Sequence, residues 1–261
     1  MTTLEVDGLT KIYRGGEDEV MALEDVSLTV NDGEFVSIIG PSGCGKSTLL
    51  RIIDGLLEPT EGEIRIDGNP VLDSGQDRGM VFQSFNLFPW RTVRTNVEFG
   101  LEAADVEKAK RREIADEFIE MVGLGDFKDA YPRELSGGMQ QRVGLARALA
   151  IDPEILLMDE PFGALDAQTR ELMQTELLKI WSKQQKTSIF VTHDIEEAIF
   201  LSDRVVVLTA RPGTVGEIVD IPFDRPRYGS DIKSSPRFGE LREELWNFLF
   251  AEEQEAETVS V

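Results

Sequence analysis

One glycine-rich stretch constrains the fold of this chain more than any other feature. It reads Gly40-Pro-Ser-Gly-Cys-Gly-Lys-Ser-Thr48 and lies between an apolar run, Glu34–Ile39, and a helix-forming run, Leu49–Asp54. Strand, glycine-rich turn and helix N-terminus follow one another in the order that a phosphate-binding loop requires. The glycines let successive N–H groups point at one phosphate, and the helix dipole adds positive potential there. The stretch therefore predicts a site for a nucleoside triphosphate.

Several side chains in and near this stretch are candidate nucleotide ligands. Lys46 would reach the β- and γ-phosphates, and the Ser47 hydroxyl would complete a Mg²⁺ shell. Tyr13, ahead of the loop, offers an aromatic face on which adenine can stack, with simple packing as the alternative. Cys44 has no evident chemical role and is interpreted as a small filler, although its alkylation is expected to block nucleotide binding and ATP to protect it. The candidates are Tyr13, Gly40, Pro41, Ser42, Gly43, Cys44, Gly45, Lys46, Ser47 and Thr48.

Polar residues at the ends of later apolar runs predict the hydrolytic half of the site. Four apolar residues, Ile155–Met158, end in Asp159-Glu160, where Asp159 would hold Mg²⁺ and Glu160 would polarise the attacking water. Gln83 ends another buried run and can reach Mg²⁺ and the water, or be only a polar strand end. His193 is the single histidine and follows a predicted strand, Ser188–Thr192, so we interpret it as a γ-phosphate sensor.

Length and composition exclude several classes of protein. A chain of 261 residues can bury a full core, and no apolar run approaches the ~18 to 20 residues that span a bilayer. The first residues have no basic segment followed by an apolar one, so no secretory signal is expected. A single cysteine excludes an internal disulfide and is typical of a reducing cytoplasm.

The charge is strongly acidic: 27 basic against 49 acidic side chains, a net charge of −22. Such a surface repels phosphate backbones and argues against a nucleic-acid partner. An alternative is that the acidity solvates the protein in a very salty cytoplasm, where self-repulsion is screened. The second hypothesis is favoured because the acidic excess is spread along the chain.

The pattern of elements predicts an α/β fold with an insertion. Strands are expected at Leu4–Leu9 and Val20–Val30, whereas residues 93–149 have helical periodicity. The predicted division is a nucleotide-binding core over residues 1–84 and 154–220, a helical subdomain over 85–153, and a linker, helix and frayed acidic tail over 221–261. Aromatic residues gather in the loop Phe85–Trp90, which is typical of an interface.

A second motif, Leu135-Ser-Gly-Gly-Met-Gln-Gln-Arg142, opens a helix inside this helical block and forms a further anion site. Together with the phosphate loop, Gln83, Asp159-Glu160, Ala164-Leu-Asp166 and His193, it resembles the ATP-binding cassette ATPases over about residues 3–220. The resemblance implies a P-loop NTPase fold: a RecA-like mixed sheet with an N-terminal antiparallel β subdomain and an inserted helical subdomain. Met139 stands where much of that family has glutamine, and we expect this to be tolerated.

The resemblance also implies partners and a mechanism. ATP and Mg²⁺ would lie between the phosphate loop of one copy and Ser136, Gly137 and Gly138 of a second copy in a head-to-tail dimer, with Asp166 communicating across the interface. Gln83 would link the nucleotide to the helical subdomain. The catalytic set would be Lys46, Gln83, Glu160 and His193, and the metal set Ser47, Gln83 and Asp159.

Within the family, the chain is similar to ATPase subunits of importers, on the cytoplasmic face of a membrane. Pro161–Arg170 and Ala210–Gly213 resemble the nitrate/sulfonate/taurine branch. A membrane permease would dock near Phe85–Trp90, and a solute-binding protein would act indirectly. The alternatives are a soluble cassette ATPase that works on nucleic acid or ribosomes, and an inactive regulatory module. Intact Lys46 and Glu160 argue against the latter.

Overall fold

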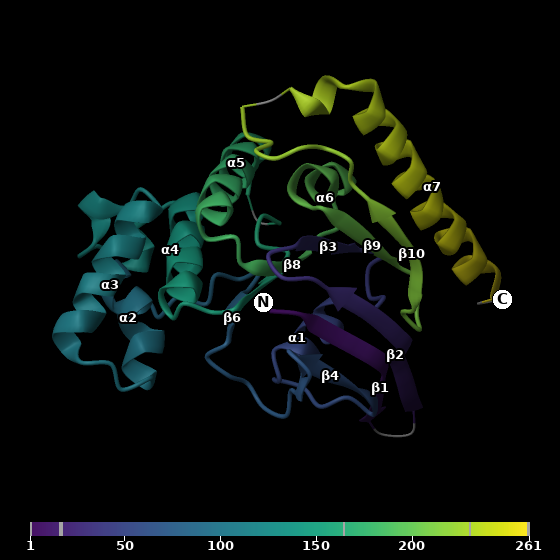
Figure 1. Ribbon diagram of the computed structural model, residues 1–261, viewed down its shortest axis with the longest axis horizontal. Helices are drawn as coiled ribbons and strands as arrows, with labels where there is room; N and C mark the ends of the chain where they lie inside the picture. Colours follow the sequence, from purple (N-terminus) through teal and green to yellow (C-terminus); the bar gives the residue numbers. More distant parts are fainter. Residues whose placement is uncertain (1, 16–17, 164, 230, 260–261) are drawn as a thin grey trace. The chain divides into compact units, whose positions relative to one another are not determined.

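The computed structural model describes residues 2–15, 18–163, 165–229 and 231–259, and its elements are labelled in Figure 1. Contacts between residues divide the chain into two compact units. The first consists of Met1–Gly75 and Gln185–Val261, and the second of Gln76–Gln184. Each unit has its own sheet pairings and helices, and each is described by itself below.

An antiparallel sheet opens the first unit. It comprises β1 (Leu4–Gly15), β2 (Asp18–Val30), β4 (Glu61–Ile66) and the short β5 (Asn69–Pro70), in the order β2-β1-β4-β5. Apolar and polar residues alternate along β1, so that Leu4 and Val6 are buried while Glu5 is exposed. This sheet confirms the predicted N-terminal antiparallel subdomain.

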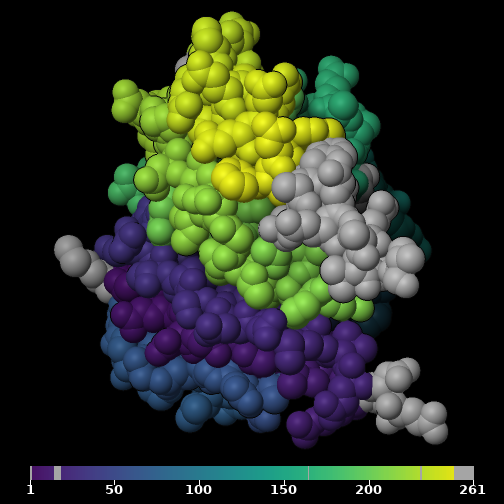
Figure 2. Space-filling view, turned by 90° about the vertical axis from the view of Figure 1, so that its right-hand side faces the viewer, coloured from purple at the N-terminus to yellow at the C-terminus, as the bar shows by residue number. Residues whose placement is uncertain are grey.

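Four further strands of the first unit form a mixed sheet, β10-β9-β3-β8. Here β3 (Phe35–Ile39) runs parallel to β8 (Thr187–Val191) and to β9 (Arg204–Leu208), and β10 (Val215–Asp220) is antiparallel to β9. Every residue of β3 and β8 is buried, as expected for parallel strands covered on both faces. The helices of this unit are α1 (Lys46–Ile53), α6 (Ile195–Leu201) and α7 (Pro236–Val259). Figure 2 shows α7, in yellow, lying across the green residues of the later strands.

The second unit holds the helical block. Helices α2 (Val93–Ala103), α3 (Lys108–Met121) and α4 (Gly137–Ala150) pack pairwise against one another, with the 3₁₀ turns η1 (Gly125–Phe127) and η2 (Pro132–Glu134) between them. The block follows β6 (Arg78–Val81) and precedes β7 (Ile155–Asp159), two parallel strands, and α5 (Ala167–Gln184) comes after β7. An α/β fold with an inserted helical part is thus confirmed. Among the described residues, no helix is long and apolar enough to cross a membrane.

Two stretches differ from the expectation. Helix α6 was not expected, because its seven residues are too few to display a helical period. Residues 251–259 continue α7 instead of forming a frayed tail, since Ala, Glu and Gln are strong helix formers.

The expected linker, residues 221–236, belongs to the first unit and contains the 3₁₀ turn η3 (Ile232–Ser234). Its anchor is Arg227, which is 1% exposed and donates to the carbonyl oxygens of Ile199 at 3.3 Å and Phe223 at 2.9 Å. Burial lowers the pKa of Arg227 to about 10. The carbonyl oxygens that bind this guanidinium come from distant positions, so the local sequence does not reveal the anchor.

Candidate active site

Three parallel strands of the first unit end at one edge of the mixed sheet. Each is followed by a segment that belongs to the candidate site. Strand β3 leads into the phosphate loop, β8 into His193, and β9 into the loop 209–214. Their registers pair Ile38 with both Val191 and Val206, so the three segments leave the sheet at the same level. Ligands of open α/β sheets bind at such an edge.

The phosphate loop packs closely against segments of β2 and β9. Gly45 caps α1 at φ 109°, and a Cβ there would lie 2.6 Å from Leu23 Cδ2 and 2.8 Å from the Ala22 carbonyl oxygen. A Cβ on Gly40 would lie 2.7 Å from the Leu208 carbonyl oxygen. Gly45 therefore requires glycine for both conformation and space, and Gly40 requires it for space.

The two reactive side chains of the loop lie inside it. Lys46, 7% exposed, donates from Nζ to the carbonyl oxygens of Gly40 at 2.8 Å and Pro41 at 3.0 Å. Cys44 is 1% exposed, with its Sγ 3.9 Å from that ammonium group. Burial raises the pKa of the Cys44 thiol, and the nearby Lys46 opposes this only in part. Cys44 is thus a packed side chain whose thiol ionises less readily than an exposed one.

Tyr13 lies beside the phosphate loop, although it comes from the antiparallel sheet. Its hydroxyl is 3.2 Å from the Thr48 hydroxyl, within hydrogen-bond distance, and 40% of the residue is exposed. The Lys11 ammonium lies 5.4 Å from the ring centroid. The sequence alone left packing and ligand contact open for Tyr13, and its exposed ring keeps a surface available for stacking.

His193 lies beside the start of the phosphate loop, because it lines the same hollow as Pro41 and Ser42. The turn that carries it is fixed by Thr192, which hydrogen-bonds Glu197 and accepts from the Asp194 N–H at 3.0 Å. Asp194 in turn accepts the Glu197 N–H and caps α6. The histidine is therefore exposed on a rigid turn at the sheet edge.

The loop 209–214 contacts the phosphate loop through hydrogen bonds and close backbone packing. Its residues were not predicted to belong to the site. Arg211 donates from Nε and Nη2 to the Gly43 carbonyl oxygen, at 3.3 and 3.2 Å. Gly213 pairs with the backbone of Ala22 and Glu24, and a Cβ on it would lie only 2.0 Å from the Cys44 carbonyl oxygen. The sequence carries one signal for it, an Arg-Pro-Gly motif two residues after an apolar strand, but that motif indicated only a branch of the family.

In the second unit, the structure brings Gln83 and Glu160 together. Gln83 Nε2 donates to Glu160 Oε2 at 3.3 Å. Asp159, the last residue of β7, is 6% exposed, and Glu160 follows at φ 42°, in the left-handed region. A non-glycine residue held there costs about 1–3 kcal/mol, a strain that is typical of functional turns. The Gly163 N–H donates to the Glu160 carbonyl oxygen at 3.1 Å and helps hold the turn.

The second anion motif also takes the expected local form. Ser136 caps α4, with its Oγ accepting the Met139 N–H at 3.4 Å, and both Ser136 and Gly137 are exposed. A Cβ on Gly138 would lie 2.9 Å from Thr169 Cγ2, so the motif packs beside the start of α5.

Asp166 also lies at the start of α5, directly before its first residue. Its Oδ1 accepts the Thr169 N–H at 3.0 Å, and the hydrogen bonds from Thr169 lower the pKa of Asp166. Ala164, of the motif Ala164-Leu-Asp166, lies outside the described residues.

The residues predicted to hold Mg²⁺ provide suitable donors. Hydroxyl, carboxylate and amide oxygens are the hard ligands that this ion prefers, and bound phosphates complete its shell. The Gln83 amide nitrogen is engaged with Glu160, which leaves its amide oxygen for a metal. Ser47 belongs to the first unit, while Gln83 and Asp159 belong to the second. In each unit the donors are of the type that this ion prefers.

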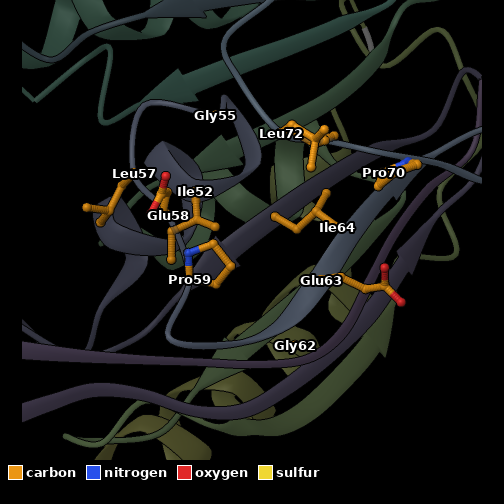
Figure 3. Close-up of a pocket in the computed structure, with 11 residues that line it drawn as sticks. Ile52, Gly55, Leu57, Glu58, Pro59, Gly62, Glu63, Ile64, Pro70 and Leu72 are labelled. Carbon is orange, nitrogen blue, oxygen red and sulfur yellow. The ribbon is translucent and has the colours of Figure 1, made fainter.

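A separate hollow of about 310 Å³ lies at the opposite end of α1 from the phosphate loop. Figure 3 shows Ile52 opposite Ile64, with Leu72 on a neighbouring segment. None of the predicted site residues lines this hollow. It is an apolar surface feature that the site does not use.

A phosphate loop after a buried parallel strand, in a mixed sheet with an antiparallel sheet and a helical insertion, defines a P-loop nucleotide hydrolase. Residues 23–163 match the family model described as ABC transporter. The chain belongs to the ABC transporter family, and it is an ATP-hydrolysing ATPase of that family.

Relatives match almost the whole chain. The ABC transporter ATP-binding protein MJ0412 of Methanocaldococcus jannaschii is 58% identical over 94% of this chain and 91% of its own length. The nitrate import ATP-binding protein NrtD of Synechococcus elongatus is 46% identical over 95% and 91%. The bicarbonate transport ATP-binding protein CmpD of a Synechocystis strain is 46% identical over 95% and 89%.

A solved structure supports the fold independently. The dimeric, post-hydrolysis state of the ATP-binding cassette MJ0796, bound to ADP and phosphate, superposes with a TM-score of 0.73 at 39% identity. The match covers 85% of this chain and all of that cassette. It confirms the P-loop NTPase fold with its antiparallel β subdomain.

Proposed function

We propose that this chain is the ATPase subunit of an importer for a small solute, most simply an anion of the size of nitrate or bicarbonate. The observation that carries the proposal is the identity of 46% to NrtD and to CmpD over 95% of the chain. Nitrate, sulfonates and taurine, the solutes of the branch that the sequence motifs resemble, are all small and anionic or zwitterionic. The chain itself would not touch the solute, which a permease and a binding protein select.

ATP hydrolysis would use the residues described above in stated roles. The phosphate loop holds the triphosphate, with Lys46 on the β- and γ-phosphates and Tyr13 against adenine. Glu160 accepts a proton from the attacking water, oriented by Gln83 at 3.3 Å, and His193 contacts the γ-phosphate. Mg²⁺, held by Ser47, Gln83 and Asp159, would neutralise phosphate charge.

Two copies would sandwich the nucleotide, as the dimeric state of MJ0796 suggests. Ser136, Gly137 and Gly138 of one copy would bind the γ-phosphate held by the phosphate loop of the other. Ser136 and Gly137 are exposed at the start of a 14-residue helix, which supports this role. Cleavage of the γ-phosphate removes the charge that both faces bind, so the dimer would open after hydrolysis.

The permease would dock at the loop Phe85–Trp90, which is partly exposed and held by hydrogen bonds. Trp90 is 72% exposed, and the Phe88 ring packs 4.5 Å from that of Phe99. Buried Asn96 accepts the Phe88 N–H at 2.8 Å, and Arg147 donates to the Phe85 carbonyl oxygen at 3.0 Å. A preorganised aromatic surface is suited to binding because little ordering entropy is lost.

The catalytic part of the proposal is tested by Glu160→Gln, which keeps the oxygen that accepts from Gln83 and removes only the base. Turnover should fall about 10²- to 10⁴-fold while ATP still binds and the ATP-bound dimer accumulates. Lys46→Ala should instead weaken ATP binding. Hydrolysis by the Gln variant at the parental rate would refute the role of Glu160.

The importer part is tested by purifying the tagged chain from native membranes and identifying its companions by mass spectrometry. A permease and a solute-binding protein are expected. Nitrate, bicarbonate and taurine are then titrated into that binding protein to find the solute. Ribosomal or DNA-repair proteins without a permease would refute the importer and favour a soluble ATPase.

A further inference from the structure

A hollow of about 550 Å³ lies beside the phosphate loop and has the C-terminal helix α7 as its second wall. Gly40, Pro41, Ser42 and the turn 193–196 form one side of it. Arg242, Trp246 and Leu249 of α7 form the other. None of the roles proposed above uses α7, so its position here needs an explanation.

Helix α7 carries apolar residues on two neighbouring faces. Phe238, Leu241 and Leu245 are at most 2% exposed and fix the helix to α6 and β9. Arg242, Trp246 and Leu249 stand at positions i, i+4 and i+7, on a neighbouring face. Trp246 nevertheless remains 52% exposed. The second face is thus held in place by the first and is directed to the hollow.

The chemistry of the walls suits a protein surface better than a charged small ligand. Pro41, Ile195, Trp246 and Leu249 supply apolar area, and tryptophan is enriched among the residues that dominate binding energy at interfaces. Two charges at the rim already satisfy each other, because Arg242 donates to Glu196 at 3.0 Å. An apolar centre with a paired polar rim is the usual anatomy of an interface.

We propose that a second copy of this chain fills the hollow when two chains dimerise on ATP, with Trp246 as a binding anchor contributed by α7. The inference rests on the head-to-tail dimer of the proposed function. Pro41 and Ser42 belong both to the phosphate loop, which the second copy covers in that dimer, and to the hollow. The α7 wall therefore continues the same interface outward from the nucleotide.

The test measures ATP-dependent dimerisation in a Glu160→Gln background, where ATP is retained. Sedimentation velocity with Mg²⁺ and ATP gives the dimer dissociation constant for this parent and for Trp246→Ala added to it. We expect dimerisation at least about tenfold weaker in Trp246→Ala, as for a central aromatic anchor. ATP affinity measured on dilute monomer should stay unchanged, since Trp246 is not assigned to the nucleotide.

The matched control is Phe248→Ala, an aromatic truncation on the same helix at a residue that is 36% exposed and does not line the hollow. Leu72→Ala, 76% exposed in the hollow of Figure 3, is a second control. Both should dimerise like the parent. Because Trp246 is half exposed, its truncation should leave the unfolding temperature nearly unchanged, and Trp246→Phe should recover part of the affinity.

Fluorescence gives a second readout that a merely structural role would not move. Adding ATP to the parent should shield Trp246 from acrylamide quenching, in proportion to the dimer formed, and the Trp246→Phe variant should lack this component. Equal or tighter dimerisation in Trp246→Ala would overturn the inference while leaving the dimer itself intact. A parent that stays monomeric at saturating ATP would overturn the proposed dimer and this inference together.

Discussion

Replacing Gly213 with alanine pushes directly on the backbone of the phosphate loop. The added Cβ would lie 2.0 Å from the Cys44 carbonyl oxygen, whereas ordinary contact begins at 3.4 Å, so the two segments must separate by about 1.4 Å, the difference between these distances. The obstacle is backbone, so no side-chain rotation relieves it. Gly213 also donates to the Ala22 carbonyl oxygen and accepts from the Glu24 N–H, both at 3.0 Å, and these bonds resist the movement.

The magnitude follows from that geometry. Overpacking a filled site costs about 1–3 kcal/mol, and a backbone clash with two opposing hydrogen bonds places Gly213→Ala near the upper end, about 3 kcal/mol. At roughly 2–4 °C per kcal/mol for a domain of this size, the midpoint of thermal unfolding should fall by about 6–12 °C. Displacement of Cys44 misaligns the loop N–H groups, so ATP affinity should fall about tenfold or more, which corresponds to about 1.4 kcal/mol.

Circular dichroism melting and calorimetric titration with ATP measure the two effects. Gly239→Ala is the matched control, because its Cβ would have no atom within 4 Å and it lies inside α7. Alanine there should stabilise the helix by up to about 1 kcal/mol and leave ATP binding unchanged. If Gly213→Ala bound ATP like the parent, the loop 209–214 would not position the phosphate loop.

Three further outcomes are expected. Because burial raises its pKa, Cys44 should react slowly with iodoacetamide at neutral pH and faster as the pH rises past 9. Mg²⁺ and ATP should slow the reaction further. Fast, pH-independent labelling would contradict the burial of this thiol. Arg211→Ala should weaken ATP binding several-fold. Arg211→Lys should recover only part of the lost affinity, since one ammonium replaces two N–H donors aimed at Gly43. Full recovery of affinity by lysine would show that charge alone matters. With a net charge of −22, ATPase activity should peak at high salt, and a peak at low salt would refute the salty-cytoplasm hypothesis.

Much of the site was predictable because each motif is coded by neighbouring residues. A loop such as Gly40–Thr48 needs glycines at fixed offsets, and those offsets are visible in the sequence. The same holds for the Ser136 cap of α4, which the structure confirms, and for the apolar strand that ends in Asp159. Helices α2, α3 and α4 were predictable from their periodicity, whereas the seven-residue α6 was too short to show one.

The sequence by itself thus determined the fold class, the family and the candidate residues, because all of these depend on local patterns. Only the tertiary structure decided which distant segments meet. Arg211 reaches Gly43 across 168 positions, and Trp246 faces Pro41 because α7 returns over α6. Such contacts depend on strand order and on long loop closures, which no local pattern encodes. The same is true of Cys44, whose raised pKa follows from burial and not from its own motif.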